Sequence, residues 1–180
     1  MAVKLVKPIN HKKVVKITNQ DFEAKMRELR VNSDIAVAVS GGPDSLALMH
    51  LSNRYALNNN INLTVLSIDH GIRAESSKEI VWLEKIAKKN KINFYSTKLK
   101  KKINSSNTLS KARTLRYEAL SKYCNKKKIK FLLTAHHLDD EIENFLMRLI
   151  RGSGIKGLSS LKAKSRYKNT KLILVRPLLE

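Results

Sequence analysis

Short apolar runs alternate with longer amphipathic segments along most of this 180-residue chain. The apolar runs have the length of strands, and the longer segments repeat their apolar residues at helical spacing. Strands that are apolar throughout are typical of a sheet buried on both faces, as parallel sheets usually are. The pattern therefore predicts an α/β fold with a doubly wound parallel sheet and helices on both faces, in three α/β/α layers.

The element boundaries follow from the same pattern. Phe22, Met26 and Leu29 have helical spacing and predict a short helix over 20–30. Residues 1–19 are basic and weakly patterned, so we expect an N-terminal arm followed by a single domain over 20–180. Within that domain we expect strands at 34–39, 62–69, 92–97, 130–135 and 171–175, and helices at 44–57, 76–90, 109–125 and 138–150.

The junction between the first predicted strand and the next helix carries the strongest chemical signal. Its residues are Ser40, Gly41, Gly42, Pro43, Asp44 and Ser45. The glycines permit a tight turn and close approach of a ligand to the backbone. A helix N-terminus offers unpaired N–H groups and the positive end of the helix dipole, which suits a phosphate.

The lysine of a Walker phosphate loop is absent from this turn. We therefore predict that the turn grips a pyrophosphate unit through its backbone, and that the Asp44 carboxylate holds Mg²⁺. An ordinary connection between a strand and a helix is the alternative.

Two further polar clusters follow predicted strands, at 69–73 and 136–140. Ligands of open parallel sheets bind outside the carboxyl ends of the strands, so these clusters are expected to line a nucleotide and its Mg²⁺. No further His or Cys at ligand spacing supports a zinc site. For Asp69 the alternative to a nucleotide contact is that it simply caps the end of its strand. The candidate residues are Asp69, His136, Asp139 and Asp140.

The predicted helix over 109–125 carries Arg113 and Arg116 one turn apart, with Tyr117 beside them. An arginine here could neutralise a phosphate or an adenylate. A solvated or salt-bridged helix face is the commoner fate of arginine. Cys124, on the same helix, is predicted to be a core or boundary residue.

The composition indicates which kind of partner the chain binds and in which cellular compartment it works. The formal net charge is +21, with 36 Lys and Arg against 15 Asp and Glu, and this favours nucleic acid. Abundant lysine, asparagine and isoleucine also fit an AT-rich coding bias. The single cysteine excludes an internal disulfide or thiol pair and fits a reducing cytoplasm. No stretch approaches the ~20 apolar residues of a membrane span, and no secretory signal is evident.

In combination the motifs resemble a known family. Residues 40–45 resemble the pyrophosphate loop of the N-type ATP pyrophosphatases, the PP-loop superfamily. Further segments, in their order and spacing over residues 20–179, are similar to the tRNA(Ile)-lysidine synthetase family. These segments are Ile68-Asp69-His70-Gly71-Ile72-Arg73, Ala112-Arg113-x-x-Arg116-Tyr117, Thr134-Ala135-His136-His137-x-Asp139-Asp140, Arg151-Gly152-Ser153-Gly154-x-x-Gly157-Leu158 and Arg176-Pro177-Leu178-Leu179.

The resemblance implies an ATP-dependent carbon–nitrogen ligase that uses ATP and Mg²⁺. Such an enzyme adenylates the C2 oxygen of the wobble cytidine of isoleucine tRNA, releases pyrophosphate, and lets the ε-amine of L-lysine displace AMP. It implies no membrane partner and leaves a homodimer open. It implies ATP contacts from residues 40–45 and Asp69, and catalytic roles for Asp44, Arg113, His136, Asp139 and Asp140.

The chain also departs from the family pattern. Glu141 and Glu143-Asn144 stand where the family usually has Gln and Glu-Thr, so those contacts are not carried over. Relatives continue past 176–179 into C-terminal tRNA-binding domains. We therefore expect this chain to bind ATP but to modify isoleucine tRNA weakly.

Three alternatives remain open. One is a PP-loop tRNA thiolation enzyme, which normally needs catalytic cysteines or a cluster. The second is an amide-forming synthetase, which would share the loop but not the other motifs. The third is a non-catalytic nucleotide- or RNA-binding remnant.

Overall fold

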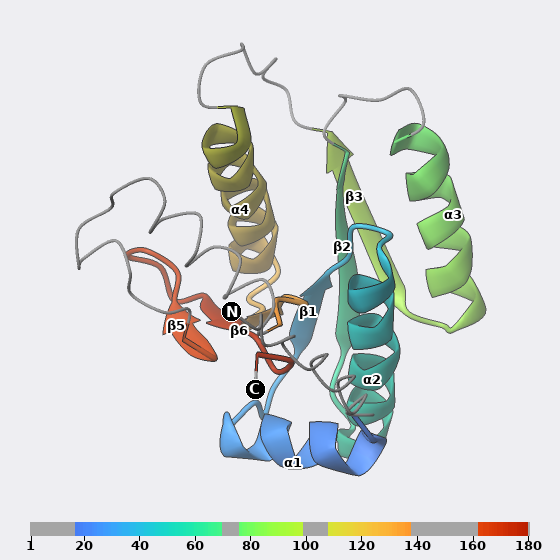
Figure 1. Cartoon of the computed structure of the whole chain (residues 1–180), viewed down its shortest axis with the longest axis vertical. Coiled ribbons are helices and arrows are strands. Elements are labelled where there is room, and N and C mark those ends of the chain that lie inside the picture. The colour runs from blue at the N-terminus through green and yellow to red at the C-terminus, as the bar shows by residue number, and fades with distance from the viewer. Residues whose placement is uncertain (1–16, 70–75, 99–107, 138–161, 180) are drawn as a thin grey trace, which may run out of the picture.

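A single sheet forms the centre of the computed structural model, which describes residues 17–69, 76–98, 108–137 and 162–179 (Figure 1). Within these residues the sheet has six strands in the order β3-β2-β1-β4-β6-β5. All neighbouring pairs are parallel except β5 and β6, which are antiparallel. The strands are β1 (Ile35–Ala38), β2 (Leu63–Asp69), β3 (Asn93–Lys98), β4 (Phe131–Leu133), β5 (Lys164–Arg166) and β6 (Ile173–Val175).

Helices cover both faces of this sheet. They are α1 (Asn19–Glu28), α2 (Pro43–Asn59), α3 (Ser76–Lys89) and α4 (Thr108–Lys126). Side chains alternate along the strands: Ile35 and Val37 join the hydrophobic cluster shared with α1, α2 and α3, whereas Ala36 joins the cluster shared with α4. Because successive strand residues point to opposite faces, this alternation places α4 on the other side of the sheet. The predicted three-layer, doubly wound α/β fold is confirmed.

The start of β1 is held in place by a buried tyrosine of α2. The Tyr55 hydroxyl donates a hydrogen bond of 2.5 Å to the Val31 carbonyl oxygen, and its ring packs edge-on to Phe22 with centroids 6.5 Å apart. Burial raises the pKa of this phenol. These contacts tie α1 and α2 to the segment that enters the central strand.

The antiparallel edge strand β5 was not among the predicted elements. Its residues, Lys164-Ser165-Arg166, are polar and only partly buried, so no apolar run marks it. It forms because a turn brings it back onto β6, with the Tyr167 N–H bonded to the Leu172 carbonyl at 2.9 Å. The predicted helix over 138–150 lies outside the described residues. The division into an arm over 1–19 and a domain over 20–180 remains a prediction.

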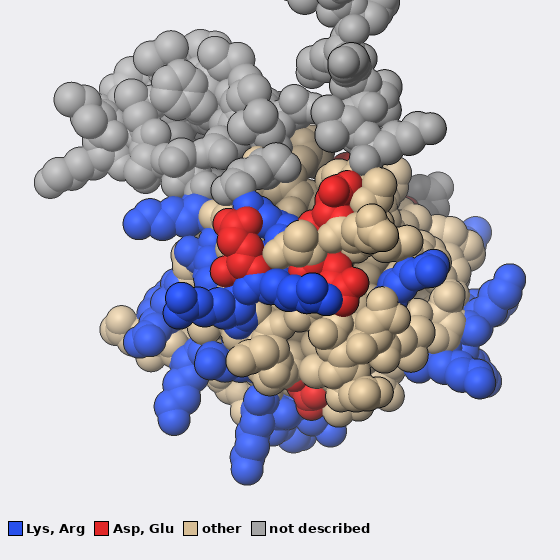
Figure 2. Space-filling view, turned by 90° about the horizontal axis from the view of Figure 1, so that it is seen from below, with Lys and Arg blue, Asp and Glu red and all other residues tan. Residues whose placement is uncertain are grey.

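Basic side chains project from several edges of the described surface. Seen from below, Lys and Arg side chains stand out on the left, the lower left and the right, while the acidic side chains gather in a few places (Figure 2). Among the helices that the structure describes, none is both long and apolar enough to cross a membrane.

Candidate functional site

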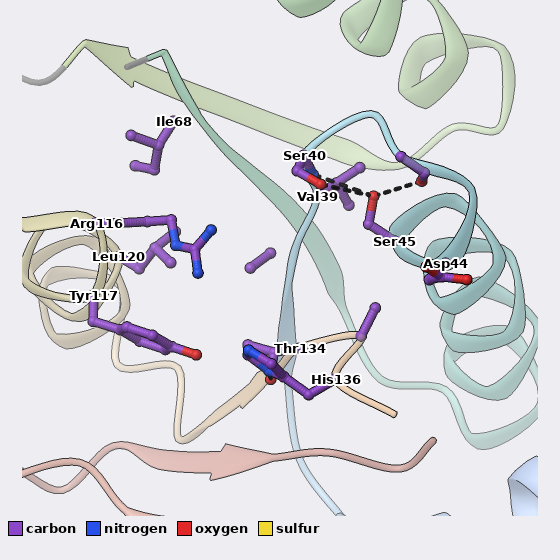
Figure 3. A pocket seen from close by; sticks show the side chains of 13 residues that line it. Val39, Ser40, Asp44, Ser45, Ile68, Arg116, Tyr117, Leu120, Thr134 and His136 are labelled. Carbon is purple, nitrogen blue, oxygen red and sulfur yellow. Dashed lines mark hydrogen bonds between the residues drawn. The ribbon is translucent and has the colours of Figure 1, made fainter. Parts of the chain in front are cut away.

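The sheet reverses its strand order beside β1. The chain passes from β1 to β2 on one side and returns later to β4 on the other side, so the carboxyl ends of β1 and β4 form a topological switch point. A pocket of about 250 Å³ lies at this point (Figure 3). Four segments that are separate in the sequence line it. The lining residues are Ala38, Val39, Ser40, Gly42, Asp44, Ser45, Ile68, Arg116, Tyr117, Leu120, Thr134, Ala135 and His136.

The turn after β1 is closed by one buried hydroxyl. Ser45 Oγ donates to the Gly42 carbonyl at 2.8 Å and accepts from the Ser40 N–H at 3.3 Å. Ser40 Oγ also lies 3.4 Å from it. The Ser45 hydroxyl therefore shapes the turn. The backbone N–H of Ser45 is the group left for a ligand.

The same turn ends at an α-helix without a side-chain cap. Gly42 is the N-cap of α2, Pro43 follows at the first helical position, and no side chain bonds the first-turn N–H groups. Gly41 has a φ of +91°, a conformation that L side chains rarely adopt. Together these features present backbone donors and the positive helix end to an anion.

Asp44 stands in the first turn of α2 at the pocket. Its side chain is 58% exposed, and its Oδ2 lies 3.6 Å from Nε2 of His137. A carboxylate oxygen is a ligand that Mg²⁺ accepts. No group of three or more His, Cys, Asp or Glu side chains gathers among the residues described, so protein ligands alone would not enclose a metal here. Mg²⁺ commonly binds through one carboxylate together with substrate phosphates and water, and Asp44 fits that arrangement.

Helix α4 supplies the opposite wall through Arg116, Tyr117 and Leu120 (Figure 3). The Arg116 guanidinium carbon lies 5.6 Å from the centroid of the Tyr117 ring, within the range of a cation–π interaction. Arg113 also approaches this ring, at 6.0 Å, but it is exposed and is not among the lining residues. The sequence motif favours Arg113 as the arginine that contacts a phosphate, whereas the position of the pocket along α4 favours Arg116 for that contact.

The segment after β4 is fixed by a buried threonine. The Thr134 N–H donates to the Val175 carbonyl at 3.0 Å, and Thr134 Oγ1 lies 3.0 Å from Nδ1 of His136. Which of these two atoms donates depends on the tautomer of the imidazole. The contact orients the His136 ring at the pocket, as a positioned acid, base or ligand requires.

Asp69 lies one strand away from the centre of the pocket. It is 4% exposed at the end of β2, with its Oδ2 3.8 Å from the Lys98 Nζ and 3.5 Å from the Ser77 hydroxyl. Its neighbour Ile68 lines the pocket, but Asp69 does not. The structure thus gathers Ser40, Gly42, Asp44, Ser45 and His136 around one pocket, with Gly41 and Pro43 in the same turn.

Arg113 and Asp69 stay outside this group of lining residues, and Asp139 and Asp140 lie outside the described residues. The pocket also contains Arg116, Tyr117 and Thr134, which were not chosen as site residues although they belong to the quoted motifs. Membership of those motifs was the signal that could have identified them.

Cys124 is removed from this chemistry. It is fully buried in the cluster beneath α4, and burial raises the pKa of its thiol to about 12. A thiol of this kind is inert at neutral pH, because the thiolate is the nucleophile and the metal ligand.

Fold, turn and pocket together define a PP-loop protein. The chain belongs to the PP-loop domain family, whose model matches residues 10–180. Among curated proteins it is 47% identical to a tRNA(Ile)-lysidine synthase of Rickettsia bellii over 146 residues, which is 81% of this chain and 33% of that protein. It is 42% identical to the enzyme of the same name from Rickettsia typhi over 162 residues, 88% of this chain and 37% of that protein. The chain thus spans about a third of the length of these relatives.

Solved structures share the fold. A U34-tRNA thiolase of Methanococcus maripaludis, solved with its 4Fe–4S cluster, superposes with a TM-score of 0.71 at 25% identity, covering 88% of this chain and 58% of that one. An FMN adenylyltransferase of Candida glabrata, in complex with FMN and the ATP analog AMPCPP, has a TM-score of 0.51 at 14% identity, covering 89% and 51%. The second likeness concerns the fold alone.

Proposed function

We propose that this chain is the ATP-binding catalytic domain of a cytoplasmic tRNA(Ile)-lysidine synthase. The observation that carries the proposal is its identity of 42–47% with enzymes of that name over 81–88% of its length. Its substrates are ATP, L-lysine and an isoleucine tRNA with a wobble cytidine, and its products are AMP, pyrophosphate and a lysidine-containing tRNA. A homodimer remains a further proposal from the sequence.

ATP lies with its β- and γ-phosphates against the turn formed by residues 40–45. The first-turn N–H groups of α2 and the helix dipole stabilise their negative charge. Asp44 is the proposed Mg²⁺ ligand, and when bound the ion would offset charge on the phosphate oxygens. Asp69 is the proposed contact for the nucleoside, through the end of β2 beside Ile68.

The reaction has two steps. The C2 oxygen of the cytidine attacks the α-phosphorus, and the bond from that phosphorus to pyrophosphate breaks with the electron pair leaving on the pyrophosphate oxygen. The lysine ε-nitrogen then attacks C2, the bond from C2 to the adenylate oxygen breaks, and AMP leaves while the amine loses a proton.

Two parts of the pocket serve these steps. Arg116 offsets charge that develops at the α-phosphate, together with Arg113, which lies about one turn closer to the N-terminus of α4. The lysine amine has an unperturbed pKa of about 10.4 and must be neutral to attack. His136, Asp139 and Asp140 are the proposed groups that position or deprotonate it.

A tRNA thiolation enzyme is the nearest alternative, because the Methanococcus maripaludis thiolase shares the fold. Sulfur transfer needs reactive thiols or a cluster. The only cysteine of this chain is Cys124, which is buried and has its pKa raised to about 12. This argues for attack by an amine rather than by sulfur.

The deciding experiment measures incorporation of labelled lysine into isoleucine tRNA, with and without ATP. We expect weak incorporation that requires both ATP and the tRNA. ATP–pyrophosphate exchange is measured in parallel. Exchange without lysine incorporation would point to another PP-loop ligase, and absence of both would favour a non-catalytic nucleotide- or RNA-binding protein.

A further inference from the structure

Helix α3 exposes an aromatic and basic stripe that the candidate site does not use. Lys78, Trp82, Lys85 and Lys89 are all exposed and are spaced by four, three and four residues. At 3.6 residues per turn, this spacing puts the four side chains within an arc of about 60°. They form one line, about 17 Å long, down the outer side of the helix.

The stripe faces away from the sheet. Leu83 and Ala87, which pack α3 into the hydrophobic core, project about 150° from it around the helix axis. Glu79 and Glu84 lie to either side of the line rather than on it. Among the residues described, no ion pair joins the three lysines to a carboxylate.

Trp82 is the feature that a solvated helix face does not explain. Its side chain is 46% exposed, and the neighbouring Val81 is 51% exposed. A coding bias towards lysine accounts for three charges but not for a large ring left half in water. An aromatic ring flanked by cations is the combination that binds unpaired nucleotides, because the bases stack on the ring and the cations neutralise phosphates.

We propose that the stripe formed by Lys78, Trp82, Lys85 and Lys89 is a docking surface for an unpaired segment of RNA. One base stacks on the Trp82 ring, and the lysines contact phosphates on either side of it. A second copy of this chain fits the surface less well, because a symmetric contact would bring the same three lysines of each copy together.

The position of α3 suits this role. Helices that connect parallel strands begin at the carboxyl edge of the sheet, so Lys78 and Trp82 lie towards the same edge as the pocket. The helix packs on β2, the direct neighbour of β1, and on β3, which lies two strand spacings or about 10 Å from β1 (Figure 1). The inference rests on the proposed function only in taking RNA as the substrate: a loop that enters the pocket would continue along α3.

Trp82 is the only tryptophan of the chain, so it reports on its own contacts. The test is to follow its fluorescence during titration with an RNA hairpin that has an unpaired loop, with the fully duplexed RNA, and with inorganic polyphosphate. We expect saturable quenching by the hairpin alone, because the duplex has no free base face and polyphosphate has no base. Equal quenching by all three, or by none, would overturn the proposal. Fluorescence that changes with protein concentration without RNA would instead identify a second copy as the occupant.

Variants then separate stacking from charge, with binding followed by the fluorescence anisotropy of a dye-labelled hairpin because Trp82→Leu removes the only tryptophan. Trp82→Leu keeps an apolar side chain and should weaken hairpin binding by about 5- to 150-fold, the range for loss of one stacked base. Replacing the three stripe lysines by Gln should reduce the salt-dependence slope by about 2. The matched control replaces the exposed Lys126, Lys127 and Lys128 by Gln, which removes the same charge elsewhere. Equal effects of the two triple variants would overturn the surface in favour of net charge.

ATP binding and ATP–pyrophosphate exchange keep this test apart from that of the enzyme. Trp82→Leu should keep the wild-type shift in Tm that an ATP analogue causes, since Trp82 does not line the pocket. A wild-type protein that quenches with hairpin RNA but shows no exchange would defeat the proposed function and leave the docking surface standing. Exchange without quenching would do the reverse.

Discussion

The two glycines of the turn are predicted to have different roles: Gly41 allows the backbone conformation of the turn, and Gly42 lets phosphates approach the backbone. Replacing each glycine by alanine separates these roles. At Gly41 the φ of +91° would strain any L side chain, although a Cβ there would meet no atom within 4 Å. Such strain costs about 1–3 kcal/mol. For a domain of this size each kcal/mol lowers Tm by about 2–4 °C, so Gly41→Ala should lower Tm by roughly 2–12 °C.

Gly42 has a φ of −71°, which alanine adopts readily, and its Cβ would make only an ordinary contact of 3.8 Å with Ser40 Oγ. Loss of a favourable N-cap residue and reduced entropy of the unfolded chain nearly cancel, so the free energy of unfolding should change by less than about 1 kcal/mol. The added methyl group would nevertheless stand on the pocket wall, where phosphates must approach the backbone.

Thermal unfolding with and without an ATP analogue measures both effects. We expect Gly41→Ala to lower the Tm of the free protein, and Gly42→Ala to preserve that Tm but to lose most of the shift caused by the analogue. The reasoning fails if both variants lower the Tm of the free protein equally, or if Gly42→Ala retains the full shift.

Three further predictions concern the site and the core. Asp44→Asn should abolish pyrophosphate release with an unchanged circular dichroism spectrum; turnover near the wild-type rate would remove Asp44 from the mechanism. Arg116→Ala should slow single-turnover adenylation by about 10-fold or more, the value of a charged hydrogen bond, and Arg113→Ala by less; equal, small effects would return both to a solvated helix face. The unfolded Cys124 thiol loses its proton near pH 9, whereas burial raises its native pKa to about 12. The contribution of this thiol to the free energy of unfolding is therefore fully present below pH 9. Above pH 9 the free energy of unfolding should fall by about 1.4 kcal/mol per pH unit relative to Cys124→Ala. Parallel pH curves for the two proteins would contradict this.

Local patterns were enough to predict the fold class and most elements. The four described helices and five of the six described strands lie at the expected positions, because apolar periodicity and turn residues act over a few neighbours. The phosphate-binding chemistry of the turn over 40–45 could also be predicted, since the residues that form the turn are consecutive in the sequence. The polar strand β5 was missed because only its partner β6 and a turn make it a strand.

The assembly of the pocket was decided by tertiary structure. Strand order depends on pairings between distant segments, and it is this order that places the end of β4 beside the end of β1. Along β2, alternation of side chains puts Ile68 on the face of the pocket and leaves its neighbour Asp69 outside the lining. Arg113 and Arg116 share a helix face, and the sequence motif pointed to Arg113; the position of the pocket along α4 instead puts Arg116 among its lining residues. The sequence alone thus determined which segments carry the chemistry, whereas packing of the helices on the sheet decided which of their side chains meet, because those contacts join residues far apart in the chain.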